Sequence, residues 1–274
     1  MQDPVFILSL RPRSGTNIFW FHLLQHPDIV GGSLYEDYFA THLPHLVRFV
    51  EDLGRSQKRL ITGPVLHNRL IKDLKMELAY SLKRIIYAPH DRYLPIPVSE
   101  NTDANHSKKR LITKTPSIEG LEYVFDFFPK AKVLILLRDP RDVIDSEMKA
   151  FGREFREQVL AWRDAARILL KFWRQRGQTN GCKVVRYEDV CGKPEEVIRD
   201  TLNFLELNTE AYDFSKIKSA PVIGSSDDFV KGSWTYKEKT ENFKSIGKWH
   251  NWHAQRLEYF KKIAGEEARI LGYE

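Results

Sequence analysis

The sequence predicts an α/β fold, in which a central and mainly parallel sheet is flanked by helices. Short runs rich in Val, Ile and Leu recur along the chain, and longer segments with helical periodicity separate them. Two of the runs are apolar throughout, as in strands that are buried on both faces. The length of 274 residues suits one large domain over 1–274. A hydrophobic fraction of 42% can fill its core, which excludes the disordered and fibrous classes.

The expected elements alternate along the chain. Strands are expected at 5–10, 111–115, 132–137 and 182–187. Helices are expected at about 16–25, 70–87, 118–128, 140–151, 154–176, 194–205 and 254–271. Two segments break the alternation and are expected to be long loops, a proline-containing one at about 89–109 and an irregular, aromatic one at about 207–246.

The charge balance points to an anionic ligand. Lys and Arg total 43 against 37 Asp and Glu, and this excess of +6 is spread along the chain, so it does not by itself predict a nucleic-acid partner. The two cysteines, Cys182 and Cys191, match neither a disulfide framework nor a zinc motif. No apolar run has the length of a signal peptide or of a membrane span. We therefore expect a cytoplasmic protein without a membrane span, a nucleic-acid partner or a metal site.

The first motif is the loop in VFILSLRPRSGTN, which follows the first expected strand and opens a helix. This geometry aims free backbone N–H groups and the positive end of the helix at a ligand, so the loop favours an anion. Gly15 lets the backbone approach the ligand and Arg13 adds charge. Ser14, Thr16 and Asn17 can donate further hydrogen bonds. An ordinary strand-to-helix turn also explains the loop, which lacks the lysine of a GxxxxGK[ST] phosphate loop.

The second motif is KVLILLRDPRDVIDS. Asp139 suits the N-cap and Pro140 the first position of a helix, so Arg138 is expected at the carboxyl end of the preceding strand. Ser146 follows eight residues later, about two helical turns on, where its hydroxyl can face an anion held by Arg138. Pairing of Arg138 with a neighbouring carboxylate is the alternative.

Together these two motifs resemble the sulfotransferase family, whose members transfer a sulfuryl group from 3′-phosphoadenosine-5′-phosphosulfate (PAPS) to an acceptor hydroxyl or amine. Two later segments, VVRYEDVCGKPEEVIRDTLNFLEL and IGKWHNWHAQRLEYFKKIAGEEARILGY, are similar to the YED and GKW segments of the family. The resemblance covers most of the chain. It implies a P-loop-like nucleotide-binding fold and PAPS as co-substrate, with no metal.

The resemblance also implies the cofactor-binding residues. The RPRSGTN loop would bind the 5′-phosphosulfate, and Arg138 with Ser146 would bind the 3′-phosphate. Tyr187 would lie near the nucleotide, while Lys248, beside Trp249 in the GKW segment, and Ser233 would close over its phosphates. An aromatic core residue, a solvated lysine and a loop serine are the alternatives for Tyr187, Lys248 and Ser233.

The loop resembles tyrosylprotein-type and bacterial members more than the cytosolic phenol and steroid enzymes. Those enzymes carry a KTH segment whose histidine is the base, and here Pro116 takes that position. Lys114 of this segment and Arg13 would stabilise the departing phosphate. Glu36 is the candidate base that the resemblance implies, with Asp37 as a rival. The histidines that remain open for this role are His22, His42, His45 and His67.

Three other functions stay open. A metal-dependent P-loop kinase explains only the first motif, and a polyanion-binding protein explains only the charge. A catalytically inactive relative that still binds PAPS is the third. The resemblance implies an in-line displacement that releases adenosine-3′,5′-bisphosphate. It leaves the acceptor open among small-molecule, lipid, carbohydrate and peptide acceptors.

Overall fold

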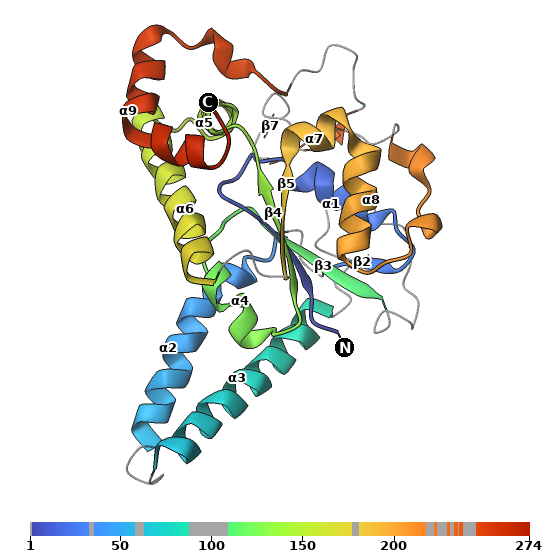
Figure 1. The fold of residues 1–274 in the computed structure, drawn as a ribbon, viewed down its shortest axis with the longest axis vertical. Coiled ribbons are helices and arrows are strands. Elements are labelled where there is room, and N and C mark those ends of the chain that lie inside the picture. Colours follow the sequence, from blue (N-terminus) through green and yellow to red (C-terminus); the bar gives the residue numbers. More distant parts are fainter. Residues whose placement is uncertain are drawn as a thin grey trace.

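A five-stranded parallel sheet forms the centre of the protein (Figure 1). The computed structural model describes residues 2–32, 36–57, 63–87, 109–176, 181–217 and 245–274, and the backbone of four two-residue strands between 222 and 237. The order in the sheet is β2-β3-β1-β4-β5. The strands are β1 (Val5–Ser9), β2 (Ile29–Gly31), β3 (Arg110–Thr115), β4 (Lys132–Leu137) and β5 (Cys182–Arg186). The predicted α/β fold with a parallel sheet is confirmed.

Helices cover both faces of this sheet. Successive side chains of a strand point to opposite faces, so Val5 and Ile7 belong to one hydrophobic cluster and Phe6 and Leu8 to the other. All four are completely buried, which explains why β1 is apolar throughout. On the Val5 side lie α1 (Thr16–Leu24), α7 (Tyr187–Gly192) and α8 (Pro194–Phe204). On the Phe6 side lie α4 (Leu121–Phe127), α5 (Pro140–Phe151), α6 (Phe155–Arg176) and α9 (Ala254–Ile270).

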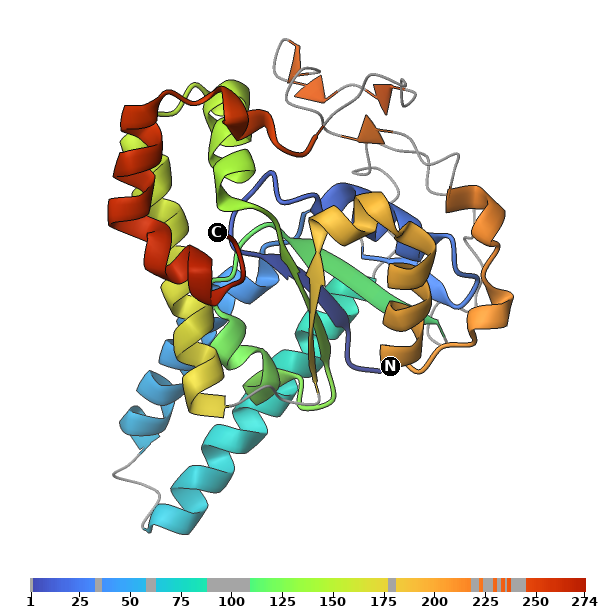
Figure 2. The ribbon, with the colours of Figure 1, turned by 45° about the horizontal axis from the view of Figure 1, so that its top comes forward.

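A pair of long helices, α2 (Phe39–Gln57) and α3 (Pro64–Tyr87), projects away from the sheet (Figures 1 and 2). The sequence predicts only the later part of α3 and misses α2. The reason is Pro44, which lies inside α2 and removes the backbone hydrogen bond to the carbonyl of Ala40. Gly120 packs against that carbonyl, since a Cβ on Gly120 would lie 1.7 Å from the Ala40 oxygen.

Other differences from the predicted elements are local. Tyr187 does not end a strand, because β5 stops at Arg186 and α7 begins at Tyr187, with Glu188 and Asp189 in its first turn, where acidic residues favour a helix start. The three-residue strand β2 was not predicted, and its shortness gives no clear pattern. Helix α4 starts at Leu121 because Gly120 is in the left-handed conformation.

Of the two expected loops, the structure describes parts of the second and almost none of the first. Residues 88–108, which hold nearly all of the first, lie outside the described part of the chain. The second contains short elements: the 3-10 helices η3 (Thr209–Ala211) and η4 (Phe214–Ile217), and the antiparallel pairs β6 (Val222–Ile223) with β9 (Tyr236–Lys237) and β7 (Phe229–Val230) with β8 (Ser233–Trp234). It is followed by η6 (Lys248–Asn251).

The sheet brings the sequence motifs to one edge. In the register of β1, Ile7 pairs with Lys114 of β3 on one side and with Leu134 of β4 on the other. The carboxyl ends of β1, β3 and β4 therefore lie side by side. Open α/β sheets bind ligands at such an edge.

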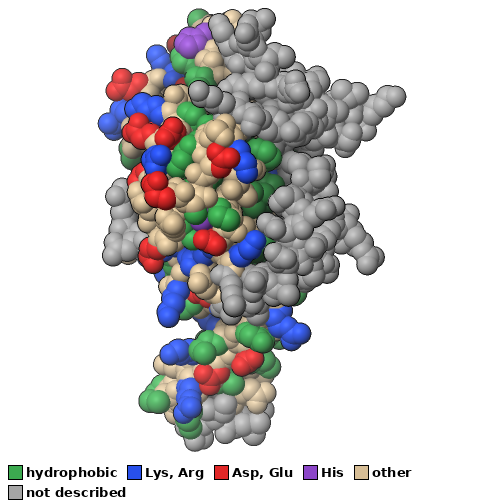
Figure 3. All heavy atoms as spheres, turned by 90° about the vertical axis from the view of Figure 1, so that its right-hand side faces the viewer, with side chains coloured by type: hydrophobic (Ala, Val, Ile, Leu, Met, Phe, Trp, Pro, Cys, Tyr) green, Lys and Arg blue, Asp and Glu red, His purple; other side chains and the backbone are tan. Residues whose placement is uncertain are grey.

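The surface carries mixed charge. On the face shown in Figure 3, acidic and basic side chains alternate over the described residues, without a region of one sign. This distribution agrees with the modest excess of +6.

Candidate active site

The loop between β1 and α1 has the backbone of an anion site. Arg13 and Gly15 both have left-handed backbone angles, with φ of 68° and 91°. The hydroxyl of Ser14 donates to the carbonyl of Arg11 at 2.7 Å, and this bond fixes the loop from inside. Gly15 is the N-cap of α1 and supplies no side-chain cap, so the first N–H groups of α1 are open to a ligand. Thr16 and Asn17 form the first turn.

Gly15 is required at its position because Tyr187 packs against it. A Cβ on Gly15 would lie 2.1 Å from Cδ2 and 2.4 Å from Cε2 of the Tyr187 ring. Tyr187 is only 7% exposed, and burial raises the pKa of its hydroxyl to about 12. The structure thus brings the YED segment directly onto the first motif.

Two arginines lie against each other at this loop. Arg138 follows β4, as predicted, and its Nη1 donates to the carbonyl of Arg13 at 2.6 Å, while Nη2 donates to the carbonyl of Ser245. Its guanidinium lies 4.6 Å from the ring centre of Tyr187. Arg13 Nε donates to the hydroxyl of Ser146 at 3.1 Å, so Ser146 faces this cluster.

The electrostatics of the pair fit a bound anion. Burial and the charge of Arg138 lower the pKa of Arg13 to about 10. Among the described residues, Nε of Arg138 is buried without a hydrogen-bond partner. The partly buried Arg13, the buried Arg138 and the unsatisfied donor are stabilised when a phosphate or sulfate group lies between them.

Asp142 of α5, which the sequence did not single out, binds the backbone of the GKW segment. Asp142 is 1% exposed, and its carboxylate accepts hydrogen bonds from the backbone N–H groups of Gly247, at 2.8 Å, and Trp249, at 3.4 Å. Arg141 lies 3.6 Å from the ring centre of Trp249. The turn that carries Lys248 therefore lies close to Arg138, which donates to the carbonyl of Ser245 just before it. The side chain of Ser233 is outside the described part of the chain.

Lys114 lies at the adjacent end of β3 and is buried, with only 1% of its surface exposed. Its Nζ donates to Oδ1 of Asn17, lies 3.5 Å from Oε1 of Glu36 and lies 5.5 Å from the ring centre of Trp20. Burial lowers the pKa of Lys114 to about 8, although the charge of Glu36 opposes this shift. The structure thus joins Glu36, Lys114 and the anion loop.

Asp37 has a different environment from Glu36. Its Oδ1 accepts from the hydroxyl of Thr115 at 2.8 Å and from the backbone N–H of Phe39 at 3.1 Å. Asp37 is 8% exposed, and burial raises the pKa of its carboxyl. These contacts anchor the loop that carries Glu36 to β3 and to the start of α2.

The four candidate histidines are distributed over three helices. His22 lies on α1 with a buried side chain, His42 and His45 lie on α2 with ring centres 6.1 Å apart, and His67 lies on α3. In the described residues, no group of three His, Cys, Asp or Glu side chains could hold a metal ion.

A second network of polar side chains, which the sequence did not predict, binds Arg11 at the start of the anion loop. Glu147 is completely buried and lies 3.1 Å from Nη2 of Arg11, which also donates to Gln158 at 3.1 Å. Glu147 directly follows Ser146, which could have suggested a buried carboxylate for the arginine-rich loop.

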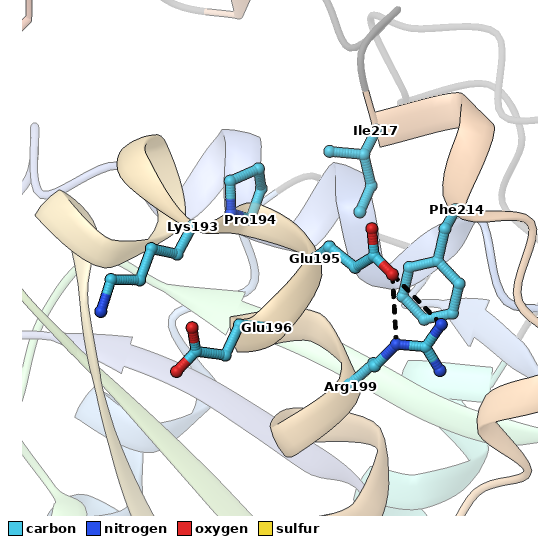
Figure 4. Close-up of a pocket in the computed structure, with 7 residues that line it drawn as sticks. All are labelled: Lys193, Pro194, Glu195, Glu196, Arg199, Phe214 and Ile217. Atoms are coloured by element: carbon cyan, nitrogen blue, oxygen red, sulfur yellow. Dashed lines mark hydrogen bonds and ion pairs between the residues drawn. The ribbon is translucent and has the colours of Figure 1, made fainter.

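A cavity of about 530 Å³ lies elsewhere, between α8 and η4 (Figure 4). Within this lining, Arg199 forms an ion pair with Glu195 at 3.1 Å and its guanidinium lies 3.9 Å from the ring centre of Phe214. None of the predicted site residues lines it. The anion loop, rather than this cavity, is the candidate active site.

An anion loop at the carboxyl edge of a parallel sheet, with two arginines and a buried lysine, is typical of proteins that bind a nucleotide or another phosphate-bearing ligand. A model of the sulfotransferase family matches residues 4–211, about three quarters of the chain, and the chain belongs to that family. The predicted family is confirmed, and the kinase alternative is not favoured.

Curated relatives agree with the tyrosylprotein-type and bacterial resemblance. Protein-tyrosine sulfotransferase A of Caenorhabditis elegans is 26% identical over 251 residues, which cover 84% of this chain and 58% of that protein. Nodulation protein NoeE of Sinorhizobium fredii is 25% identical over 300 residues, which cover 98% of this chain and 65% of that protein. The chain thus spans less than two thirds of the length of these relatives.

Solved structures share the fold. The sulfotransferase domain from the Synechococcus PCC 7002 olefin synthase has a TM-score of 0.58 and 18% identity, covering 100% of this chain and 97% of that one. Mouse sulfotransferase SULT7A1 complexed with PAP has a TM-score of 0.51 and 15% identity, covering 98% and 84%. Among the described helices of this protein, none is long and apolar enough to cross a membrane, and the cytoplasmic location stays a prediction.

Proposed function

We propose that this protein transfers a sulfuryl group from PAPS to an acceptor hydroxyl and releases adenosine-3′,5′-bisphosphate. The observation that carries the proposal is the cluster of Arg13, Arg138, Ser146 and Tyr187 around the open N-terminus of α1. This cluster presents two adjacent cations and backbone donors, which suits a ligand with phosphate and phosphosulfate groups.

The proposed cofactor contacts divide between two ends of the cluster. The backbone of the Arg13–Ser14–Gly15 turn, with Thr16 and Asn17, holds the 5′-phosphosulfate. At the other end, Arg138 and Ser146 hold the 3′-phosphate, and Tyr187 packs beside the nucleotide. The turn with Lys248 and Trp249, anchored by Asp142, closes this end. Ser233 remains a proposed contact on sequence grounds alone.

The proposed chemistry uses Glu36 and Lys114. Glu36 accepts the proton of the acceptor hydroxyl, whose oxygen attacks sulfur in line with the departing phosphate oxygen. Lys114 and Arg13 stabilise the charge that grows on that oxygen. The contacts of Lys114 with both Glu36 and Asn17 support these roles, because they connect the Glu36 carboxylate to the first turn of α1.

The acceptor is proposed at the level of a hydroxyl-bearing molecule. The similar proteins named for tyrosine sulfation and nodulation favour screening tyrosine peptides and oligosaccharides first. Small alcohols and lipids are the remaining acceptors to be screened. The screen uses PAPS and measures release of the bisphosphate.

Arg138→Ala is expected to weaken adenosine-3′,5′-bisphosphate binding about 10- to 100-fold. The substitution removes a buried, charged donor, and a hydrogen bond to a charged group contributes about 1.5–3 kcal/mol. Isothermal titration calorimetry without added metal measures the effect. ATP with magnesium serves as the comparison ligand.

Arg199→Ala is the matched control for this substitution. Arg199 also stacks on an aromatic ring, but it lies at the cavity of Figure 4 instead of the anion loop. Its loss should leave bisphosphate affinity unchanged. Unchanged affinity in folded Arg138→Ala, or a preference for ATP with magnesium in the wild type, would contradict the proposed cofactor site.

The pH dependence of kcat/KM is expected to show an alkaline decline near pH 8. Burial lowers the pKa of Lys114 to about 8, so the lysine is charged below this pH and neutral above it. The stabilising charge for the leaving group is therefore lost as the pH rises. An ordinary lysine would keep its charge to about pH 10.

The measurement uses an aliphatic alcohol as acceptor, since such a hydroxyl does not titrate in this range. Circular dichroism at each pH checks that the protein stays folded. A kcat/KM that is constant up to about pH 10 would show that the charge of Lys114 does not assist the transfer.

A further inference from the structure

The hydroxyl of Tyr38 already makes the contact that an acceptor must make. It donates a hydrogen bond to Oε2 of Glu36 at 3.1 Å. The other carboxylate oxygen, Oε1, lies 3.5 Å from Nζ of Lys114, which contacts Asn17 of the anion loop. A general base must lie within hydrogen-bond distance of the proton that it removes. A hydroxyl of this chain therefore occupies the acceptor side of the proposed base.

The backbone holds Tyr38 at this place. Its φ of 52° is in the left-handed region, which is uncommon for a residue with a large side chain. The Tyr38 carbonyl accepts from the backbone N–H of Thr41 at 3.0 Å and from its hydroxyl at 2.7 Å. The preceding residue, Asp37, is bound to Thr115 of β3. These contacts fix the chain on both sides of the tyrosine, while 38% of Tyr38 remains exposed.

We propose that Tyr38 is a site of self-sulfation, modified by the enzyme's own bound PAPS when no other acceptor is present. The Tyr38 oxygen forms a bond to sulfur, and the bond from sulfur to the 5′-phosphate oxygen breaks. The phenolic proton passes to Glu36, and adenosine-3′,5′-bisphosphate leaves. The products are a tyrosine O-sulfate and the bisphosphate. The inference rests on the proposed function, because it uses the same donor and the same base.

The charges around Tyr38 make Glu36 necessary for this step. Burial and the neighbouring Glu36 raise the pKa of the Tyr38 hydroxyl to about 12, so the phenol is protonated at neutral pH. Attack by the oxygen therefore needs a base to remove the proton. The sulfate ester that forms is an anion, and it is repelled once Glu36 ionises again. Among the described residues, Tyr38 is the tyrosine with a hydrogen bond to Glu36, so we expect a single transfer.

Exposure alone does not select a tyrosine for this reaction. Tyr80 is 54% exposed on α3, more than Tyr38, and it belongs to the projecting helical pair. Tyr80 is therefore the internal control for chemical sulfation without the active site.

The test incubates the purified full chain with PAPS and no acceptor, followed by intact-mass measurement and peptide mapping. We expect the mass of one SO₃ group, located on Tyr38. The gain should be absent in Tyr38→Phe and in Glu36→Gln, and present in Tyr80→Phe. Circular dichroism confirms that each variant is folded.

Two results would overturn self-sulfation while leaving the proposed function intact. The first is a wild-type protein that binds adenosine-3′,5′-bisphosphate in the calorimeter but gains no SO₃. The second is a gain that persists in Tyr38→Phe or that falls on Tyr80. A protein that does not bind the bisphosphate would instead refute the proposed function, and self-sulfation with it.

Discussion

A Gly15→Ala variant is expected to lose bisphosphate binding by about 100-fold or more and to unfold more easily. The added Cβ would lie 2.1 Å from Cδ2 of Tyr187, so the ring or the loop must move. Overpacking of this kind costs about 1–3 kcal/mol, and the left-handed φ of 91° adds roughly 1 kcal/mol for a residue with a side chain. Because the loop itself forms the anion site, its displacement removes binding as well as stability. Calorimetry and chemical denaturation measure the two effects.

Gly152→Ala separates backbone strain from the collision with Tyr187. Gly152 has a φ of 63°, and a Cβ there meets nothing within 4 Å. The free energy of unfolding of Gly152→Ala should therefore fall by only roughly 1 kcal/mol, the cost of the left-handed backbone for alanine. Its affinity for adenosine-3′,5′-bisphosphate should be unchanged. In the double variant Gly15→Ala with Tyr187→Ala, stability should partly return, since the colliding ring is absent. Equal effects of the two glycine substitutions would show that the packing of Tyr187 is unimportant.

The parts of the fold that local sequence determines could be predicted. The apolar runs of β1 and β4 are buried on both faces, and Asp139 with Pro140 starts α5, where the Asp139 carboxylate accepts from the N–H of Arg141 at 2.9 Å. Local signals failed where tertiary contacts decide. Helix α2 contains Pro44, and the Ala40 carbonyl one turn earlier packs against Gly120, a residue far along the chain.

The candidate site shows the same division. Motif spacing predicts that Arg138 and Ser146 face the same anion, and the structure brings both to Arg13 of the anion loop. Nothing local predicts that Tyr187 packs on Gly15 or that Asp142 binds the Gly247 turn, because each contact joins distant segments. The burial of Lys114 likewise depends on neighbours from other elements. Their roles in catalysis remain proposals.

Glu36→Gln is expected to lower kcat about 100- to 10,000-fold, the range in which general bases contribute. The amide keeps the size of the side chain but cannot accept the acceptor proton at neutral pH. The anion loop does not include residue 36, so the affinity for adenosine-3′,5′-bisphosphate should stay within about threefold, as expected for a residue outside the phosphate contacts. Steady-state kinetics with the acceptor found in the screen measure kcat, and calorimetry measures the affinity.

Asp37→Asn is the matched variant that separates the two carboxylates. An asparagine keeps an oxygen at the position of Oδ1, so it can still accept from Thr115 and from the backbone N–H of Phe39. If Glu36 is the base, Asp37→Asn retains most of its turnover while Glu36→Gln loses it. The reverse result would assign the proton transfer to Asp37, whose raised pKa and burial would then serve catalysis instead of anchoring the loop. Because both substitutions replace a carboxylate with an amide, the comparison depends on position alone.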